Sequence, residues 1–144
     1  MSAEVITALI TACGGILLTG ATYWFTKQKE READWRKEKL EHYKEFVASL
    51  SGVISGETTT EGHRVFARAC NKLNLVAPQP VIEALREFQQ EIKISNPDKS
   101  QDRHDKLMSH LFYQIRKDLD ISPTDDIKTF QVGLWASGVK PPKN

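Results

Sequence analysis

The amino-terminal part of the chain is dominated by one long uncharged stretch. Residues Val5 to Phe25 contain no charged side chain, in a chain in which 27% of the residues are charged. A helix of this length covers about 31 Å at ~1.5 Å per residue, which matches the hydrocarbon core of a bilayer. The stretch closes with Tyr23, Trp24 and Phe25, where an interfacial aromatic belt would lie. The pattern therefore predicts a transmembrane helix over residues 1–26.

Basic residues gather on the carboxyl-terminal side of this predicted span. Lysines and arginines follow it closely, whereas the amino-terminal side offers only Glu4 and the α-amine. The positive-inside rule then places the amino terminus outside and the bulk of the chain in the cytoplasm. Two alternatives are a cleaved signal peptide, which would need a basic start and a small-residue cleavage site, and a buried core helix, which is usually shorter and has a polar face. We prefer the span.

One face of the predicted span is small and hydroxylated. At about 100° per residue, its members share one side of the helix, opposite the bulky aliphatic residues. They are Ala8, Thr11, Gly15, Thr19 and Thr22. Faces of small residues let membrane helices approach closely, so we expect the spans to self-associate. The stripe either lines a narrow gated pathway or serves only for helix association, and each threonine can also bond its own helix.

Helical periodicity continues after the span, and the sequence shows no convincing two-residue alternation. Residues 27–39 are nearly all charged and contain neither Gly nor Pro, which predicts a solvated helical stalk. A heptad-like seam then runs over residues 40–54 and indicates either a coiled coil or, as we prefer, one helix of a bundle. Gly56 is a natural terminator for this helix. A capping-box pattern from Thr58 to Glu61 opens the next one.

Prolines and capping residues divide the remaining chain. Pro80 can open a helix, and Ser100 with Asp102 opens the following one. The apolar stripes of the predicted helices include Val65, Phe66, Leu73, Phe88 and, at a helix end, Ile94. A last short helix is predicted from residues 122–123, with acidic residues in its first turn.

Short links between amphipathic helices predict an all-α fold. We expect one amino-terminal transmembrane helix that continues into a cytoplasmic antiparallel bundle of about four helices, plus the short carboxyl-terminal helix. The predicted divisions are the transmembrane helix (1–26), the stalk (27–39), the bundle (40–132) and a tail (133–144).

The charge of the chain limits its possible partners, and its cysteine content limits its redox environment. The chain has 20 basic and 19 acidic residues and a formal net charge of +1, so charge gives no indication of a nucleic-acid partner, and we expect no duplex nucleic acid. Its cysteines, Cys13 and Cys70, suit a reducing cytoplasm and predict no disulfide.

The sequence contains no catalytic constellation that we can identify. The histidines have no metal-ligand spacing, and there is neither a Gly-rich phosphate loop nor a nucleophile elbow. These histidines are His42, His63, His104 and His110. We predict that the protein is not an enzyme and has no metal or other cofactor.

One set of basic residues is a candidate anion-binding or nucleotide-binding site. Arg64, Arg68 and Lys72 recur every four residues, share one helix face and have no acid at the same spacing. Guanidinium and ammonium groups are common ligands of phosphate. Arg116 and Lys117 join this set if the bundle brings them close.

Other readings of the same residues stay open. Tyr113 or Trp35 would be able to stack on a base. The basic face is alternatively an ordinary solvated surface, or it pairs with an acidic neighbour such as Glu83 or Glu87. Arg116 and Lys117 lie near the carboxyl end of a predicted helix, where the helix dipole alone favours cations.

Part of the chain resembles known proteins. The segments EHYKEFVASLSGVISG, VIEALREFQQEI and LFYQIRKDLDI resemble a widespread group of small bacterial single-span proteins. A span, a charged stalk and a small helical bundle resemble the membrane effectors of bacterial anti-phage systems, most of all the Hailong-type effector. The resemblance is architectural over most of the chain and carries over no binding residue. It implies a homo-oligomeric channel of the bacterial inner membrane, held in check by a short oligodeoxyadenylate that a partner nucleotidyltransferase makes.

We therefore predict an oligomeric single-pass membrane effector, taken as a tetramer. It would form a gated pore that depolarises the inner membrane in anti-phage defence by abortive infection, regulated by a nucleotide on the cytoplasmic domain. The alternatives are a membrane-anchored helical adaptor and a phage-encoded membrane regulator, neither of which forms a pore.

Overall fold

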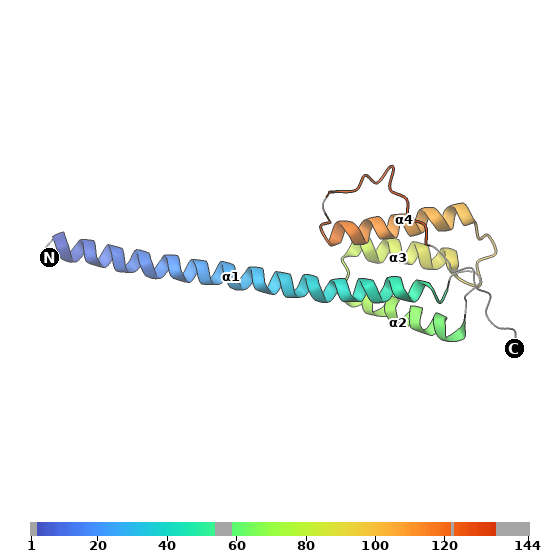
Figure 1. Ribbon diagram of the computed structural model, residues 1–144, viewed down its shortest axis with the longest axis horizontal. Coiled ribbons are helices and arrows are strands. Elements are labelled where there is room, and N and C mark those ends of the chain that lie inside the picture. Colours follow the sequence, from blue (N-terminus) through green and yellow to red (C-terminus); the bar gives the residue numbers. More distant parts are fainter. Residues whose placement is uncertain (1–2, 54–58, 122, 135–144) are drawn as a thin grey trace. The chain divides into compact units, whose positions relative to one another are not determined.

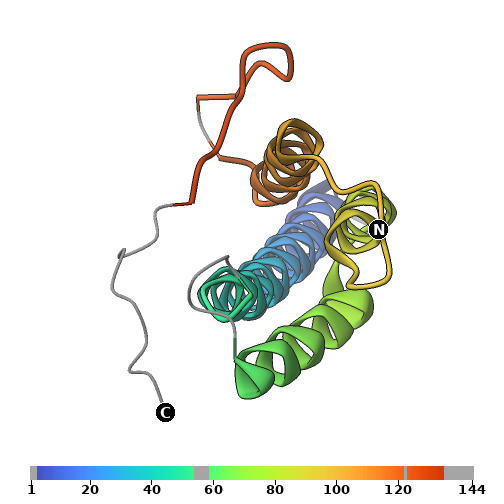
Figure 2. The same cartoon turned by 90° about the vertical axis from the view of Figure 1, so that its right-hand side faces the viewer.

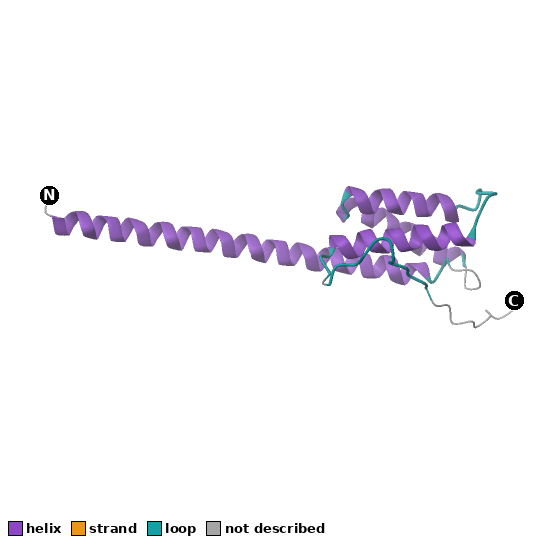
Figure 3. Cartoon of the chain, turned by 90° about the horizontal axis from the view of Figure 1, so that it is seen from above, coloured by secondary structure: helices purple, strands orange, loops and turns teal. Residues whose placement is uncertain are grey.

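The regular elements in the part that the structure describes are all helices. The computed structural model describes residues 3–53, 59–121 and 123–134, without the side chains of residues 5–14, 16 and 17. Four helices and no strands occur within these ranges, which confirms the all-α prediction (Figure 3). The helices are α1 (Ala3–Leu50), α2 (Thr60–Val76), α3 (Gln79–Ile92) and α4 (Gln101–Asp118), as labelled in Figure 1.

The chain divides into two units, Met1–Glu38 and Lys39–Asn144. In the first unit, the charged part of α1 is exposed and is stabilised by contacts along its own surface. Lys27 Nζ lies 2.7 Å from Glu30 Oε2, and Gln28 Nε2 donates to Glu32 Oε1 at 3.3 Å. Pairs at these spacings connect neighbouring turns of one helix and add a small stabilisation.

The predicted transmembrane helix receives no support from the structure. Within the described ranges, none of the helices combines the length and the apolar character that crossing a membrane requires. The side chains of residues 5–14, 16 and 17, which form most of the predicted span, lie outside the described residues. The span therefore stays a prediction from the sequence.

In the second unit, the last turns of α1 join the other helices in a four-helix bundle (Figure 2). Successive helices run in opposite directions, because the links between them are too short for a crossover. Helices α2 and α4 lie on opposite sides of this bundle, with α3 and the end of α1 between them (Figures 1 and 2).

The core of this unit is built from the apolar stripes of all four helices. From α1 it takes Tyr43, Phe46 and Leu50, each at most 2% exposed, so the seam of this helix packs into a bundle core. The other helices contribute Phe66, Ala69, Cys70, Leu73, Val76, Val81, Ala84, Leu85, Phe88, Met108, Leu111 and Ile115. Burial of each large side chain contributes about 1.5–3 kcal/mol. Val65 and Ile94, which we placed on apolar stripes, are instead exposed at 39% and 85%.

The turn after α1 differs from the prediction. Helix α1 ends at Leu50, and Gly52 N then donates to Ser49 O at 3.2 Å. A Cβ on Gly52 would lie 2.6 Å from the Cα of Gly62 in the first turn of α2. The two backbones are therefore in direct contact, and this contact requires a glycine on both sides. Gly56, the predicted terminator, lies outside the described residues.

The cap of α2 is also shifted by one residue. Its N-cap is Thr59, whose hydroxyl accepts from Gly62 N at 2.9 Å. The capping box that we predicted from Thr58 is wrong, because this geometry places Gly62, and not Glu61, at the third helical position. The other predicted starts are close to those observed, since Pro80 is the second residue of α3 and Ser100 is the N-cap of α4.

The predicted short carboxyl-terminal helix does not form in the described residues that follow α4. Residues 127–129 form a turn, in which Asp126 O accepts from Thr129 N and Phe130 N. The Asp126 side chain also accepts from Lys128 N at 3.0 Å, and such local bonds compete with helix formation. We call residues 123–134 the strap, because they run back along α4 and are bonded to it by side chains.

Candidate functional site

The small stripe of α1 is described only in part. Gly15, Thr19 and Thr22 are exposed, whereas the side chains of Ala8 and Thr11 lie outside the described residues. Thr19 Oγ1 donates to Gly15 O, and Thr22 Oγ1 donates to Leu18 O, both at 2.8 Å. Both hydroxyls thus bond their own helix, which is one of the alternatives that the sequence left open.

Large apolar side chains on other sides of this helix are exposed in a single copy of the chain. Leu18 is 72% exposed, and Tyr23, Trp24 and Phe25 are between 59% and 66% exposed. Trp24 and Phe25 contact each other edge to face, with ring centroids 5.2 Å apart. Their outer surfaces have no cover from the described residues of the chain.

The basic face of α2 carries carboxylates beside every predicted ligand. Arg64 Nη1 lies 3.6 Å from Glu61 Oε2, and Arg68 Nη2 lies 3.3 Å from Glu61 Oε1. Lys72 Nζ donates to both oxygens of Glu45 on α1, at 2.7 and 2.9 Å. All of these side chains are well exposed, so solvent weakens each ion pair and the pairs add little stability. The face is therefore a paired ionic surface, on which a phosphate would compete with Glu61 and Glu45.

Pairing of the basic face with acidic residues was one of the alternatives from the sequence. The structure shows such pairing, but with other acidic residues than the ones we named. The partners are Glu61, at the start of α2, and Glu45, on a different helix. Glu83 instead accepts from Gln79 at 2.7 Å. The carboxylate that pairs with Lys72 belongs to Glu45, 27 residues earlier in the chain, and no spacing rule could reveal this pairing.

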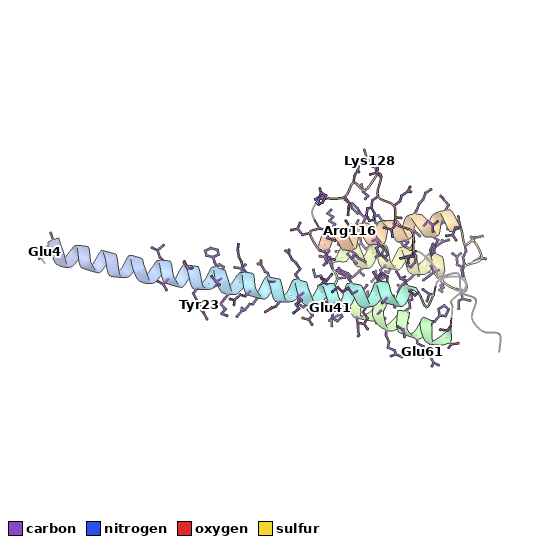
Figure 4. The ribbon with its side chains drawn as sticks, viewed as in Figure 1. Glu4, Tyr23, Glu41, Glu61, Arg116 and Lys128 are labelled. Atoms are coloured by element: carbon purple, nitrogen blue, oxygen red, sulfur yellow. The ribbon has the colours of Figure 1, made fainter. Side chains whose placement is uncertain are left out.

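Arg116 and Lys117 are not brought to the basic face of α2. Figure 4 shows Glu61 and Arg116 on opposite sides of the helical unit. Arg116 pairs with Asp125 of the strap through Nε and Nη2, at 2.5 and 3.2 Å, and its guanidinium lies 5.7 Å from the centroid of the Phe130 ring. Lys117 is exposed on α4. The predicted set of five cations is thus split between two surfaces.

The aromatic residues proposed to stack on a base belong to helices other than α2. Tyr113 packs against Phe130 of the strap, with ring centroids 5.9 Å apart. Trp35 is 49% exposed and belongs to the other unit of the chain. Neither lies on α2, so neither shares a helix with the basic face.

A pocket of about 1020 Å³ lies in the helical unit and was not predicted from the sequence. Its walls come from the end of α1, the end of α3, the first turns of α4 and residues 127–134 of the strap. Leu50, Phe88 and Met108 are apolar residues of this lining. Because these segments are far apart in the sequence, no local motif indicates the pocket.

Some of the charged groups on the lining are paired with neighbours. Lys106 Nζ lies 2.7 Å from Asp102 Oδ2, and His104 Nδ1 lies 3.0 Å from Asp105 Oδ1. The hydrogen bond with His104 holds the pKa of the Asp105 carboxyl below its usual value.

Glu91 is a buried carboxylate on the pocket wall, at 4% exposure. Its Oε1 accepts from Ser100 N at 2.7 Å, and its Oε2 lies 3.4 Å from Arg103 Nη1. A buried carboxylate is tolerated only with such partners, and these link the end of α3 to the start of α4. Glu91 thus has a structural explanation and does not present a free oxygen for acid–base chemistry.

The histidines do not assemble into a metal site among the described residues, where no group of three or more potential ligands is present. His42 Nδ1 lies 3.9 Å from Glu45 Oε2, and the His104 ring packs on Phe88 with centroids 5.3 Å apart. Comparison of the chain with protein-family models, with curated proteins and with solved structures finds no match in any of the three.

Proposed function

We propose that this protein is a membrane-anchored effector that self-associates through α1 and forms a gated pore. The observation that carries the proposal is the composition of this helix. One helix of 48 residues contains both the uncharged stretch Val5–Phe25 and the charged residues 27–39. The described apolar side chains of the stretch, such as Leu18 and Trp24, are exposed in a single copy. Contiguous exposed apolar surface marks contact with lipid or with another protein.

Internal hydrogen bonds support the placement of α1 in lipid. Lipid offers no hydrogen-bond partner, so a polar group that enters it needs one within the protein. Thr19 and Thr22 already donate to backbone carbonyls of their own helix. Their side chains therefore present methyl groups and satisfied hydroxyls, which suits close contact with a neighbouring helix.

The helical unit is the regulatory part of this proposal. An effector acts on a pore only through a difference in its affinity for the open and closed states. The expected regulator is a short oligodeoxyadenylate, which is the implication of the resemblance to Hailong-type effectors. If its phosphates bind the basic face of α2, they displace Glu61 from Arg64 and Arg68.

The test is a dye-leak assay on the full chain reconstituted into liposomes, with two matched glycine substitutions. Gly15 belongs to the small stripe. Gly20 is rotated about the helix axis by about 140° from Gly15, at ~100° per residue, and so lies outside the stripe. A Cβ on either glycine meets nothing within 4 Å in a single copy. Gly15→Leu and Gly20→Leu therefore leave one chain unstrained, and a difference between them reports contact between copies.

We expect the wild type and Gly20→Leu to release dye and to form a homo-oligomer in detergent, as measured by light scattering. Gly15→Leu should lose both properties while it remains bound to membranes. A protein that stays on the membrane but releases no dye under any nucleotide condition is the membrane-anchored adaptor, and the pore is then wrong. A full-length chain that does not bind membranes refutes the anchor as well.

A further inference from the structure

The charged side chains of the stalk are exposed and mostly unpaired in one copy of the chain. Residues 18–38 of α1 are all exposed. Among the described residues 27–38, one ion pair forms, between Lys27 and Glu30, and one other side-chain hydrogen bond joins Gln28 to Glu32. The remaining charged side chains of these described residues have neither kind of contact, so their charges are open to a second molecule.

The charges of this segment divide between two sides of the helix. We measure the angle about the helix axis from Lys29, at ~100° per residue. The basic stripe then lies between about 340° and 80° and consists of Lys29, Arg36 and Lys37. The acidic stripe lies between about 100° and 180° and consists of Glu30, Asp34 and Glu38. Lys27 falls on the acidic side, where Glu30 neutralises it. The centres of the two stripes are therefore about 120° apart.

The acidic stripe is unfavourable in a single helix. Its members follow one another at intervals of four residues, and like charges at this spacing destabilise an isolated helix. A basic surface laid along the stripe removes this repulsion. In a parallel neighbour in register, the basic stripe offers such a surface, because each of its residues lies within about 3 Å of an acidic residue along the axis, at ~1.5 Å per residue. The two stripes are thus complementary both in charge and in position along the helix.

The small stripe of α1 faces the arc between the two charged stripes. In the same angular frame, Gly15, Thr19 and Thr22 lie at about 40°, 80° and 20°, and the midpoint between the charged stripes is at about 80°. Helix α1 is continuous from Ala3 to Leu50, so these angles describe one rod. In a ring whose copies each turn the acidic stripe toward one neighbour and the basic stripe toward the other, the small stripe faces the inside. The charge pattern and the small stripe thus indicate the same arrangement of copies.

We propose that the stalks of neighbouring copies dock side by side and in parallel, with the basic stripe of one copy against the acidic stripe of the next. The partner of this surface is a second copy of the chain. Charges that flank a helix–helix contact set the choice, direction and register of the partner helix. The inference rests on the proposed self-association through α1 and identifies its polar surface, but it does not require the assembly to conduct.

A charge swap tests the docking in the full chain, with self-association in detergent followed by light scattering over a range of protein concentrations. Asp34→Lys and Arg36→Glu each place like charges across the contact between copies. We expect each variant alone to lower the association constant by about fivefold or more. An equimolar mixture of the two should associate as the wild type does, because copies that alternate bring the two reversed charges together.

Two control variants make the same changes of charge on the third side of the stalk. Arg31 and Glu32 lie at about 200° and 300° in the same frame, outside both stripes. Glu32→Lys matches Asp34→Lys in charge, and Arg31→Glu matches Arg36→Glu. We expect each control to change the association constant by less than about twofold. All four positions are exposed, and circular dichroism checks that each variant keeps its helices.

Loss of association in both stripe variants, recovery in their mixture and unchanged controls support the docking. A monomeric wild type, stripe variants that associate normally, or a loss that the mixture does not restore overturns it. If Arg36→Glu instead loses binding to phosphatidylglycerol vesicles and keeps its self-association, the basic stripe faces lipid headgroups and the docking is wrong. Recovery by the charge swap in a protein that releases no dye refutes the pore alone.

Discussion

The contact between Gly52 and Gly62 should make the start of α2 intolerant of even one methyl group. In Gly62→Ala, the new Cβ would lie 2.7 Å from the Cα of Gly52 and 2.9 Å from its carbonyl carbon. Carbon atoms in ordinary contact are about 3.5–4.0 Å apart, so the two backbones must separate by about 1 Å. Neither atom belongs to a flexible side chain, and relief therefore requires movement of the turn after α1 or of α2 itself.

The expected cost follows from two opposing terms. Overpacking of this kind costs about 1–3 kcal/mol, and contact of backbone with backbone places it toward the upper end. Alanine in a helix gains roughly 0.5–1 kcal/mol over glycine. We therefore expect Gly62→Ala to lower the free energy of unfolding by about 2 kcal/mol. Urea unfolding of the full chain, followed by circular dichroism, measures this difference.

Two further variants test whether the contact between Gly52 and Gly62 causes the expected loss of stability. Gly133→Ala introduces the same methyl group where nothing lies within 4 Å and should leave stability unchanged or slightly higher. Gly52→Ala should destabilise as Gly62→Ala does, and the double variant should lose less than the sum, because the first methyl group has already separated the backbones. Fully additive losses, or a Gly62→Ala protein as stable as the wild type, would refute the reasoning.

The remaining predictions concern a thiol and a pH dependence. Cys70 is 1% exposed, and burial raises the pKa of its thiol to about 11. In a Cys13→Ser background we therefore expect iodoacetamide to label Cys70 at pH ~8 only after unfolding. Rapid labelling of the folded protein would contradict the burial of this thiol. The Arg116 guanidinium lowers the pKa of the Asp125 carboxyl below its ordinary value of 3.8. Stability from this pair is therefore complete above the unfolded-state pKa and is lost as the pH falls through the lower folded-state value. Unfolding midpoints between about pH 5 and pH 3 should fall less steeply for Asp125→Asn than for the wild type, and equal slopes would show that the pair adds no stability.

The core was largely visible in the sequence, because a buried stripe repeats with the helical period. Phe66, Leu73 and Phe88 lie where this period placed them, and all are buried. The helical period does not predict burial at the margins of a stripe, where a residue such as Val65 lies between the core and solvent. Only the position of the neighbouring helix decides which way such a residue faces.

Helix boundaries were less predictable, for a physical reason that the start of α2 illustrates. Three consecutive threonines, residues 58–60, all have a hydroxyl that suits an N-cap. The structure uses Thr59, in the register that places Gly62 against Gly52. Local chemistry left the choice open, and a contact between distant segments decided it. The strap shows the same principle, because Asp125 belongs to an ion pair with α4 instead of to the first turn of a helix.

The candidate site depended on tertiary structure most of all. Spacing correctly placed Arg64, Arg68 and Lys72 on one exposed face of α2. It was unable to show that Glu45 of α1 lies beside Lys72, or that Arg116 lies on the opposite side of the bundle. Electrostatic pairing depends on distance in space, and sequence separation says nothing about it between different helices.

By itself, the sequence determined that this protein is helical, that its charge-free stretch precedes a charged one, and which positions form the core. These properties depend on periodicity and on composition, which are local. Tertiary structure alone decided the contact of Gly52 with Gly62, the pairing of Lys72 with Glu45 and the pocket beside the strap. Each of these joins different elements of the fold, and only packing of the helical unit brings their atoms within contact distance.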